Sequence, residues 1–156
     1  MLAQLERADA LSILNTFLER IKKSHGDIIT TRHYDIMLQI CAKAKPASKA
    51  ALQTALDVYA FLDTNAKGSF EATDSTYSHL MNTIGKQLPK TDNRRKESLV
   101  RIFKKAANEG LVSYFVWNAL RRSLPYKAHF DVLRLAVSKD GKLSYDNVPK
   151  EWKRRL

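Results

Sequence analysis

Apolar side chains recur at intervals of three and four residues through most of the chain, the spacing of one buried face of an α-helix. One group of segments opens this face with an aromatic residue, at residues 31–44, 74–88 and 114–124. Proline follows each of these segments, at Pro46, Pro89 and Pro125, where a helix cannot continue. Sustained alternation of apolar and polar residues, typical of strands, is almost absent. The pattern therefore predicts an all-α protein.

A second group of helical segments comes before glycines that recur at a constant interval. Gly26, Gly68 and Gly110 are each 42 residues from the next. The segments before them cover residues 7–24, 48–65 and 95–109, and a last helix is expected at about 126–138. A period of this size indicates a repeat array. We expect each glycine to end a helix, and Thr30 or Thr31 and Thr73 or Asp74 to be N-caps.

The chain begins with a helix of the second group, so it starts within a repeat. Each helical pair has too little apolar surface to fold alone, and neighbours must stack. We expect residues 1–138 to form a helical repeat domain of about three repeats with a leading half-repeat, followed by a basic tail at 139–156. The early start favours a piece of a longer array or a subunit docked on a neighbour.

Charge is unevenly distributed along the chain. The net charge is +11, yet residues 1–85 hold nine basic and nine acidic side chains. Residues 86–156 hold eighteen basic and seven acidic ones. A basic block on a folded unit favours an anionic partner: nucleic acid, an acidic protein surface or a membrane face. Subunits of RNA-rich assemblies are often generically basic, so charge alone does not define a site.

Catalytic, metal and membrane-spanning classes find little support in the residues. The four histidines form no metal-binding pair, and neither a Gly-rich phosphate loop nor a nucleophile elbow is present. Cys41 is the single cysteine and lies on an apolar helix face, which predicts a buried thiol. No apolar run approaches the ~18 residues that span a bilayer. We expect no enzyme, no cofactor, no metal, no small-molecule substrate and no membrane insertion.

Polar residues recur in register along the first group of helices. Counting by four gives these rows: Asp35, Gln39 and Lys43; Ser78, Asn82 and Lys86; Asn118 and Arg122. Residues at such spacing share one face of a helix. Helices stacked side by side would make the rows a single surface whose amides pair with base edges and whose cations neutralise phosphates. The alternative is an ordinary solvated face.

Two phrases resemble pentatricopeptide repeats: ALDVYAFLDTNAKGSFEATDSTYSHLMNTI and SLVRIFKKAANEGLVSYFVWNALRRSLP. That family's repeat opens with an aromatic-polar pair, matched by Tyr34-Asp35, Tyr77-Ser78 and Trp117-Asn118. The closing segment is similar to tails of algal or diatom-type members, and the resemblance covers roughly residues 7–138. The repeats here are longer than usual and lack the family's proline-aspartate link. Tetratricopeptide and other α-solenoid repeats remain alternatives.

The resemblance implies a right-handed α-solenoid of stacked antiparallel helical hairpins that binds single-stranded RNA, about one base per repeat, in a mitochondrion or chloroplast. In the family, the polar residue after the aromatic contacts a base and the last residue of the repeat assists it. Base-contacting candidates are Asp35, Ser78 and Asn118, and assisting candidates are Thr73 and Ser113. Arg32, Ser75 and Phe115 occupy the family's base-stacking position, and Phe115 alone is aromatic there.

Two tighter basic clusters flank the polar rows. Arg94 and Arg95 begin a helix, where cations oppose the helix dipole, whereas Arg121 and Arg122 end one. The first cluster is therefore the less expected on stability grounds and a candidate for phosphate or protein contact. We expect non-catalytic binding of single-stranded RNA in organellar RNA processing, stability or translation. The rival hypothesis is a protein–protein scaffold that uses the same groove, with further repeats or other subunits as partners.

Overall fold

The structure is a computed structural model of the chain. It describes residues 30–45, 47–64, 70–137 and 140–155, together with Thr16, Glu19 and Lys23. Apart from those three residues, the helix expected at 7–24 lies outside the described residues. The same holds for Gly26, Gly68 and Pro46, so the start of the chain within a repeat stays a prediction.

The regular elements of the described residues are helical. The α-helices are α2 (Thr31–Lys43), α3 (Lys49–Thr64), α4 (Asp74–Gln87), α5 (Asn93–Glu109), α6 (Tyr114–Ser123) and α7 (Tyr126–Leu133). Short 3₁₀ helices follow as η2 (Arg134–Ala136), η3 (Tyr145–Asn147) and η4 (Lys150–Lys153). Within the described ranges, extended pairing is limited to one isolated antiparallel bridge between Val137 and Leu143. The prediction of an all-α protein is confirmed.

The helix ends follow from local chemistry. Thr73 precedes α4, and its hydroxyl oxygen accepts a hydrogen bond from the Thr76 backbone N–H at 3.2 Å. Ser113 caps α6 in the same way through the Val116 N–H at 3.4 Å. These hydroxyls satisfy backbone donors that a helix start leaves free. At the other kind of boundary, Gly110 ends α5 in the left-handed region with φ 75°, which confirms its expected role.

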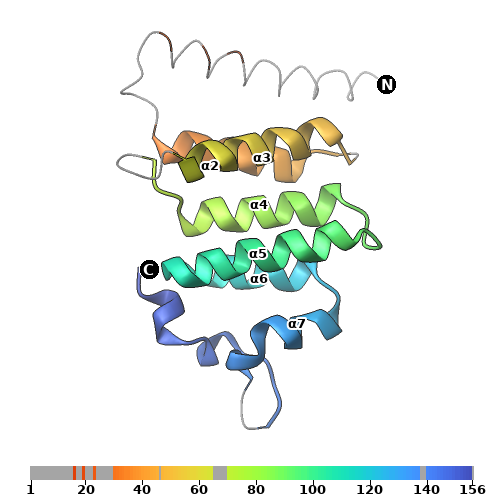
Figure 1. The fold of residues 1–156 in the computed structure, drawn as a ribbon, viewed down its shortest axis with the longest axis vertical. Coiled ribbons are helices and arrows are strands. Elements are labelled where there is room, and N and C mark those ends of the chain that lie inside the picture. The colour runs from red at the N-terminus through yellow and green to blue at the C-terminus, as the bar shows by residue number, and fades with distance from the viewer. Residues whose placement is uncertain are drawn as a thin grey trace.

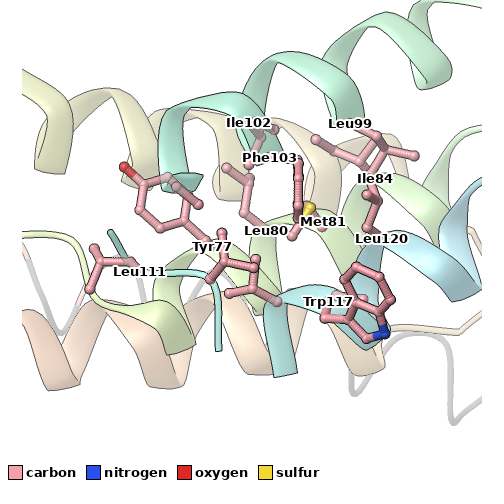
Figure 2. Close-up of a cluster of buried hydrophobic side chains, with 14 of the residues drawn as sticks. Tyr77, Leu80, Met81, Ile84, Leu99, Ile102, Phe103, Leu111, Trp117 and Leu120 are labelled. Carbon is pink, nitrogen blue, oxygen red and sulfur yellow. The ribbon is translucent and has the colours of Figure 1, made fainter. Parts of the chain in front are cut away.

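The helices of the first group, α2, α4 and α6, pack side by side, with α4 in contact with both of the others. Helix α3 packs on α2 and α4, and helix α5 packs on α4 and α6. The elements succeed one another along the longest axis of the molecule (Figure 1). Side chains of α4, α5 and α6 fill the space between them, among them Tyr77, Met81, Phe103 and Trp117, all of which are buried (Figure 2).

Gly85 lies within α4 rather than at a helix end, and a close helix contact explains it. A Cβ atom placed on Gly85 would lie 2.2 Å from Ser123 Oγ and 2.7 Å from Ser123 Cβ. The Ser123 hydroxyl donates to the Met81 carbonyl at 3.3 Å across the same contact. The backbones of α4 and α6 approach closely here because one partner has no side chain and the other has a small one.

The basic segment expected as a C-terminal tail packs against α5 and α6. The ring centroids of Trp152 and Phe103 are 5.7 Å apart, with the rings edge to face. The ring centroids of Tyr145 and Trp117 are 6.1 Å apart in a similar arrangement. The Val112 N–H donates to the Trp152 carbonyl at 2.8 Å. Val148 is buried. Residues 140–155 therefore cover the C-terminal end of the helical layers.

Candidate nucleic-acid interface

Helices α2 and α4 run in the same direction, as their cross-links show. Near the helix starts, the Thr31 hydroxyl donates to the Glu71 carbonyl at 3.0 Å. Near the helix ends, the Gln87 amide donates to the carbonyls of Cys41 and Ala44 at 3.2 and 3.3 Å. Equivalent positions of the two helices therefore lie at the same height, which brings the polar rows predicted from the sequence into register.

Helices α2, α4 and α6 line an open cleft of about 320 Å³. Its lining consists of Gln39, Ala42, Lys43, His79, Asn82, Gly85, Lys86, Arg122 and Ser123. We call it the basic cleft. It brings together five side chains that the sequence predicted as one surface: Gln39, Lys43, Asn82, Lys86 and Arg122. Amides and cations from three helices thus share one solvent-accessible space.

The three cations of the basic cleft differ in whether they have a hydrogen-bond partner within the fold. The Lys86 ammonium donates to the Ala42 carbonyl at 2.8 Å, near the end of α2, where the helix dipole favours positive charge. Lys43 and Arg122 are exposed, and neither is held by a hydrogen bond or ion pair to another described residue. Their charges are therefore available to an anion.

His79 was not among the residues predicted from the sequence, yet it lines the basic cleft. Burial lowers the pKa of its imidazole, and the Lys43 charge lowers it too, whereas Asp35 and Asp74 act in the opposite direction. The signal that could have found it is its position three residues before Asn82, because residues at that spacing share a helix face.

Asp35 and Thr73, expected to act together, are in contact. The Thr73 hydroxyl donates to Asp35 Oδ2 at 2.9 Å, and the Thr76 hydroxyl donates to Oδ1 at 2.5 Å. Burial raises the pKa of the Asp35 carboxyl, although both hydroxyl hydrogen bonds lower it. Both carboxylate oxygens thus have protein donors, and this half-buried group links α2 to the start of α4.

Ser78, expected to contact a base, and Ser113, expected to assist, are both largely buried. Ser78 is 5% exposed, and its hydroxyl donates to the Ser75 carbonyl at 3.1 Å. Ser113 is 8% exposed, and its hydroxyl caps α6. Their hydroxyls are therefore used within the fold, by the Ser75 carbonyl and by the start of α6. Asn118 is half-buried on α6 and stays a candidate.

Arg94 and Arg95, expected as a phosphate or protein contact, are occupied within the fold. Arg95 is 7% exposed and donates to the Ser123 carbonyl through Nε and Nη2, at 3.0 and 2.8 Å, and to the Leu88 carbonyl at 2.9 Å. Arg95 caps the ends of α4 and α6. Its buried guanidinium is therefore not available to an anion, contrary to the prediction. Arg94 is exposed and pairs with Asp92 at 2.8 Å.

The exposed aromatic residues Tyr114 and Phe115 stand at the start of α6. Their exposed fractions are 58% and 68%. They line a second cleft, of about 620 Å³, with the starts of α4 and α6 on its walls. Its lining consists of Glu71, Ala72, Thr73, Asp74, Leu111, Ser113, Tyr114, Phe115 and Arg155. We call it the aromatic cleft. Phe115 was predicted to offer a ring here, and Tyr114 was not.

Arg121 is exposed at the end of α6, next to Arg122. Among the described residues, no group of three His, Cys, Asp or Glu side chains is placed to hold a metal ion. None of the helices in the described ranges is both long and apolar enough to cross a bilayer.

Comparison of the chain with models of known protein families, with curated proteins and with solved structures finds no match.

Proposed function

We propose that this protein is a right-handed α-solenoid resembling pentatricopeptide repeats and that it binds single-stranded RNA without catalysing a reaction. Its setting would be organellar RNA processing, stability or translation, which rests on the family resemblance. The observation that carries RNA binding is the basic cleft, where Gln39, Asn82 and three cations from α2, α4 and α6 line one space. Amides pair with base edges and cations neutralise phosphates, so both parts of a nucleotide find partners.

The aromatic cleft supplies the complementary chemistry. The rings of Tyr114 and Phe115 are exposed on the helix that also carries Arg122. A base stacked on an aromatic ring contributes about 1–3 kcal/mol to single-strand binding, with little dependence on sequence. A strand that follows α6 would place a base on Phe115 and a phosphate near Arg122. The RNA would therefore be held most firmly at the C-terminal part of the repeats, where the excess positive charge lies.

Affinity for a mixed single-stranded RNA pool, measured by fluorescence anisotropy over a salt series, tests this proposal. The logarithm of affinity should fall linearly with the logarithm of salt, by ~0.7 per phosphate neutralised. The variants Lys43→Ala and Arg122→Ala should each weaken binding and reduce that slope. Lys104→Ala removes an equal charge from the exposed face of α5 and serves as the control. Failure of the wild-type chain to bind the pool at low salt would reject the proposal.

A second candidate function is a protein–protein scaffold, which the aromatic cleft favours. Exposed rings beside the carboxylate of Asp74 suit an apolar peptide that carries a basic residue, whereas Glu71 in the same lining already pairs with Arg155. Pull-down from a cell extract followed by competition with RNA separates the two functions. A protein partner lost in the double variant Tyr114→Ser/Phe115→Ser, but retained in Lys43→Ala/Arg122→Ala, would support the scaffold.

A further inference from the structure

We propose that His79 is a proton-dependent contact to the RNA phosphate in the basic cleft, so that RNA binding tightens as the pH falls. This inference rests on the proposed function and adds a regulated contact to it. His79 lines the cleft together with Lys43, Lys86 and Arg122, whose charges would draw a phosphate towards the imidazole. A protonated imidazole donates from both ring nitrogens and adds one positive charge.

The surroundings of His79 disfavour its protonated form in the free protein, so the imidazole is able to take up a proton when a phosphate binds. From α2, Asp35 and Lys43 act on it; from its own helix, Asp74 acts on it and Lys86 shares its cleft; from α6, Arg122 lines the same space. Burial and Lys43 together outweigh the two carboxylates, and the pKa of the imidazole is lowered from its usual value. Without RNA, the ring is therefore mainly neutral at pH 7.

A phosphate in the cleft reverses this balance. Its negative charge favours the imidazolium, so the pKa of His79 is higher in the complex than in the free protein. Binding then takes up a proton, and affinity is greatest at low pH and is lost as the pH rises through the bound-state value. If the difference between the two states is one pKa unit, affinity changes about tenfold across the transition.

Salt dependence separates a phosphate contact from a merely structural role. Each phosphate neutralised on a single strand contributes about 0.7 to the slope of log affinity against log salt. We therefore expect the wild-type slope to be steeper by that amount at pH 5.5 than at pH 8. A histidine that only supports the fold would leave the slope unchanged.

The decisive variants are His79→Gln and His79→Lys, measured by anisotropy with a fluorescent single-stranded RNA at pH 5.5, 7 and 8. Glutamine should abolish the pH dependence and keep the shallow slope at every pH. Lysine carries a permanent charge and should show the steep slope even at pH 8. His33→Gln is the matched control, because His33 Nδ1 accepts from the Thr30 N–H at a helix start, where glutamine serves equally well.

Asp35 is the competing titratable group, since burial raises the pKa of its carboxyl and its protonation would also favour an anion. Asp35→Asn removes a charge that favours the imidazolium of His79, so the pH dependence should persist with its midpoint at lower pH. A pH dependence that persists in His79→Gln would overturn the assignment while leaving RNA binding intact. Wild-type protein that binds no RNA at any pH and low salt would overturn the proposed function, and the assignment with it.

Discussion

Arg94 and Arg95 are neighbours at the start of α5, yet their guanidinium groups lie in opposite environments. Arg95 is buried and donates three hydrogen bonds to the carbonyls of Leu88 and Ser123, whereas Arg94 is exposed and pairs with Asp92. Replacing Arg95 with methionine keeps most of the side-chain volume but leaves these carbonyls without their donor. A buried polar group that loses its partner costs about 1–3 kcal/mol.

We therefore expect Arg95→Met to lower the free energy of unfolding by about 1–3 kcal/mol, as measured by urea denaturation followed by circular dichroism. Arg94→Met is the matched control and should unfold at the wild-type urea concentration, because a surface ion pair adds little. Equal effects of the two substitutions would show that Arg95 does not cap α4 and α6. RNA affinity should be insensitive to Arg95→Met under conditions where the variant is folded.

Cys41 offers a residue-scale test of the core. Its side chain is fully buried in α2, and burial raises the pKa of the thiol to about 11. At pH 8 only about one thiol in a thousand is ionised, and the thiolate is the reactive form. We expect a thiol reagent to leave the folded protein unmodified and to react once urea unfolds it. Reaction of the native protein at the rate of free cysteine would contradict the packing of α2.

At the scale of elements, the contact between α4 and α6 depends on the absence of a side chain at Gly85. Alanine is favoured over glycine within a helix by about 1 kcal/mol, but here its Cβ would overlap Ser123. Overpacking of a close contact costs typically ~1–3 kcal/mol. We expect Gly85→Ala to be destabilising in urea denaturation despite the better helix propensity.

The double variant Gly85→Ala/Ser123→Gly controls this prediction. Glycine at position 123 removes both atoms nearest to the new methyl group, Oγ and Cβ. The alanine should therefore cost less in that background than in the wild type, and the difference measures the clash between the two helices. An alanine that stabilises the wild-type chain would show that α4 and α6 lie further apart.

The sequence was sufficient for what depends on neighbours along the chain. Helical periodicity and capping residues located α2, α4 and α6 to within about a residue, and the polar spacing identified most of the basic cleft. It was insufficient where one helix covers another. The sequence predicted exposed side chains at Ser78 and Arg95, but both are buried in the fold. His79 lines a cleft because residues of α2 and α6 lie beside it. Such packing depends on distances between elements, which periodicity does not specify.

At the scale of the whole molecule, residues 140–155 pack over α5 and the start of α6. Their contacts combine rings and backbone: Trp152 packs on Phe103, and the Arg155 N–H donates to the Gly110 carbonyl at 3.0 Å. An end of stacked helices that is left uncovered exposes apolar surface, and these contacts cover it here. The basic segment therefore contributes to stability as well as to charge.

Trp152→Ala tests this capping role. The indole is half-buried between η4 and α5, so the loss should be smaller than the ~3–5 kcal/mol of a fully buried tryptophan, about 1–3 kcal/mol. Because Phe103 and Val112 would then be less well covered, we also expect concentration-dependent association in analytical ultracentrifugation. Glu151→Ala changes an exposed side chain of the same turn and should leave both properties unchanged. If Trp152→Ala unfolds at the wild-type urea concentration and sediments as the wild type does, the segment adds charge without holding the layers together.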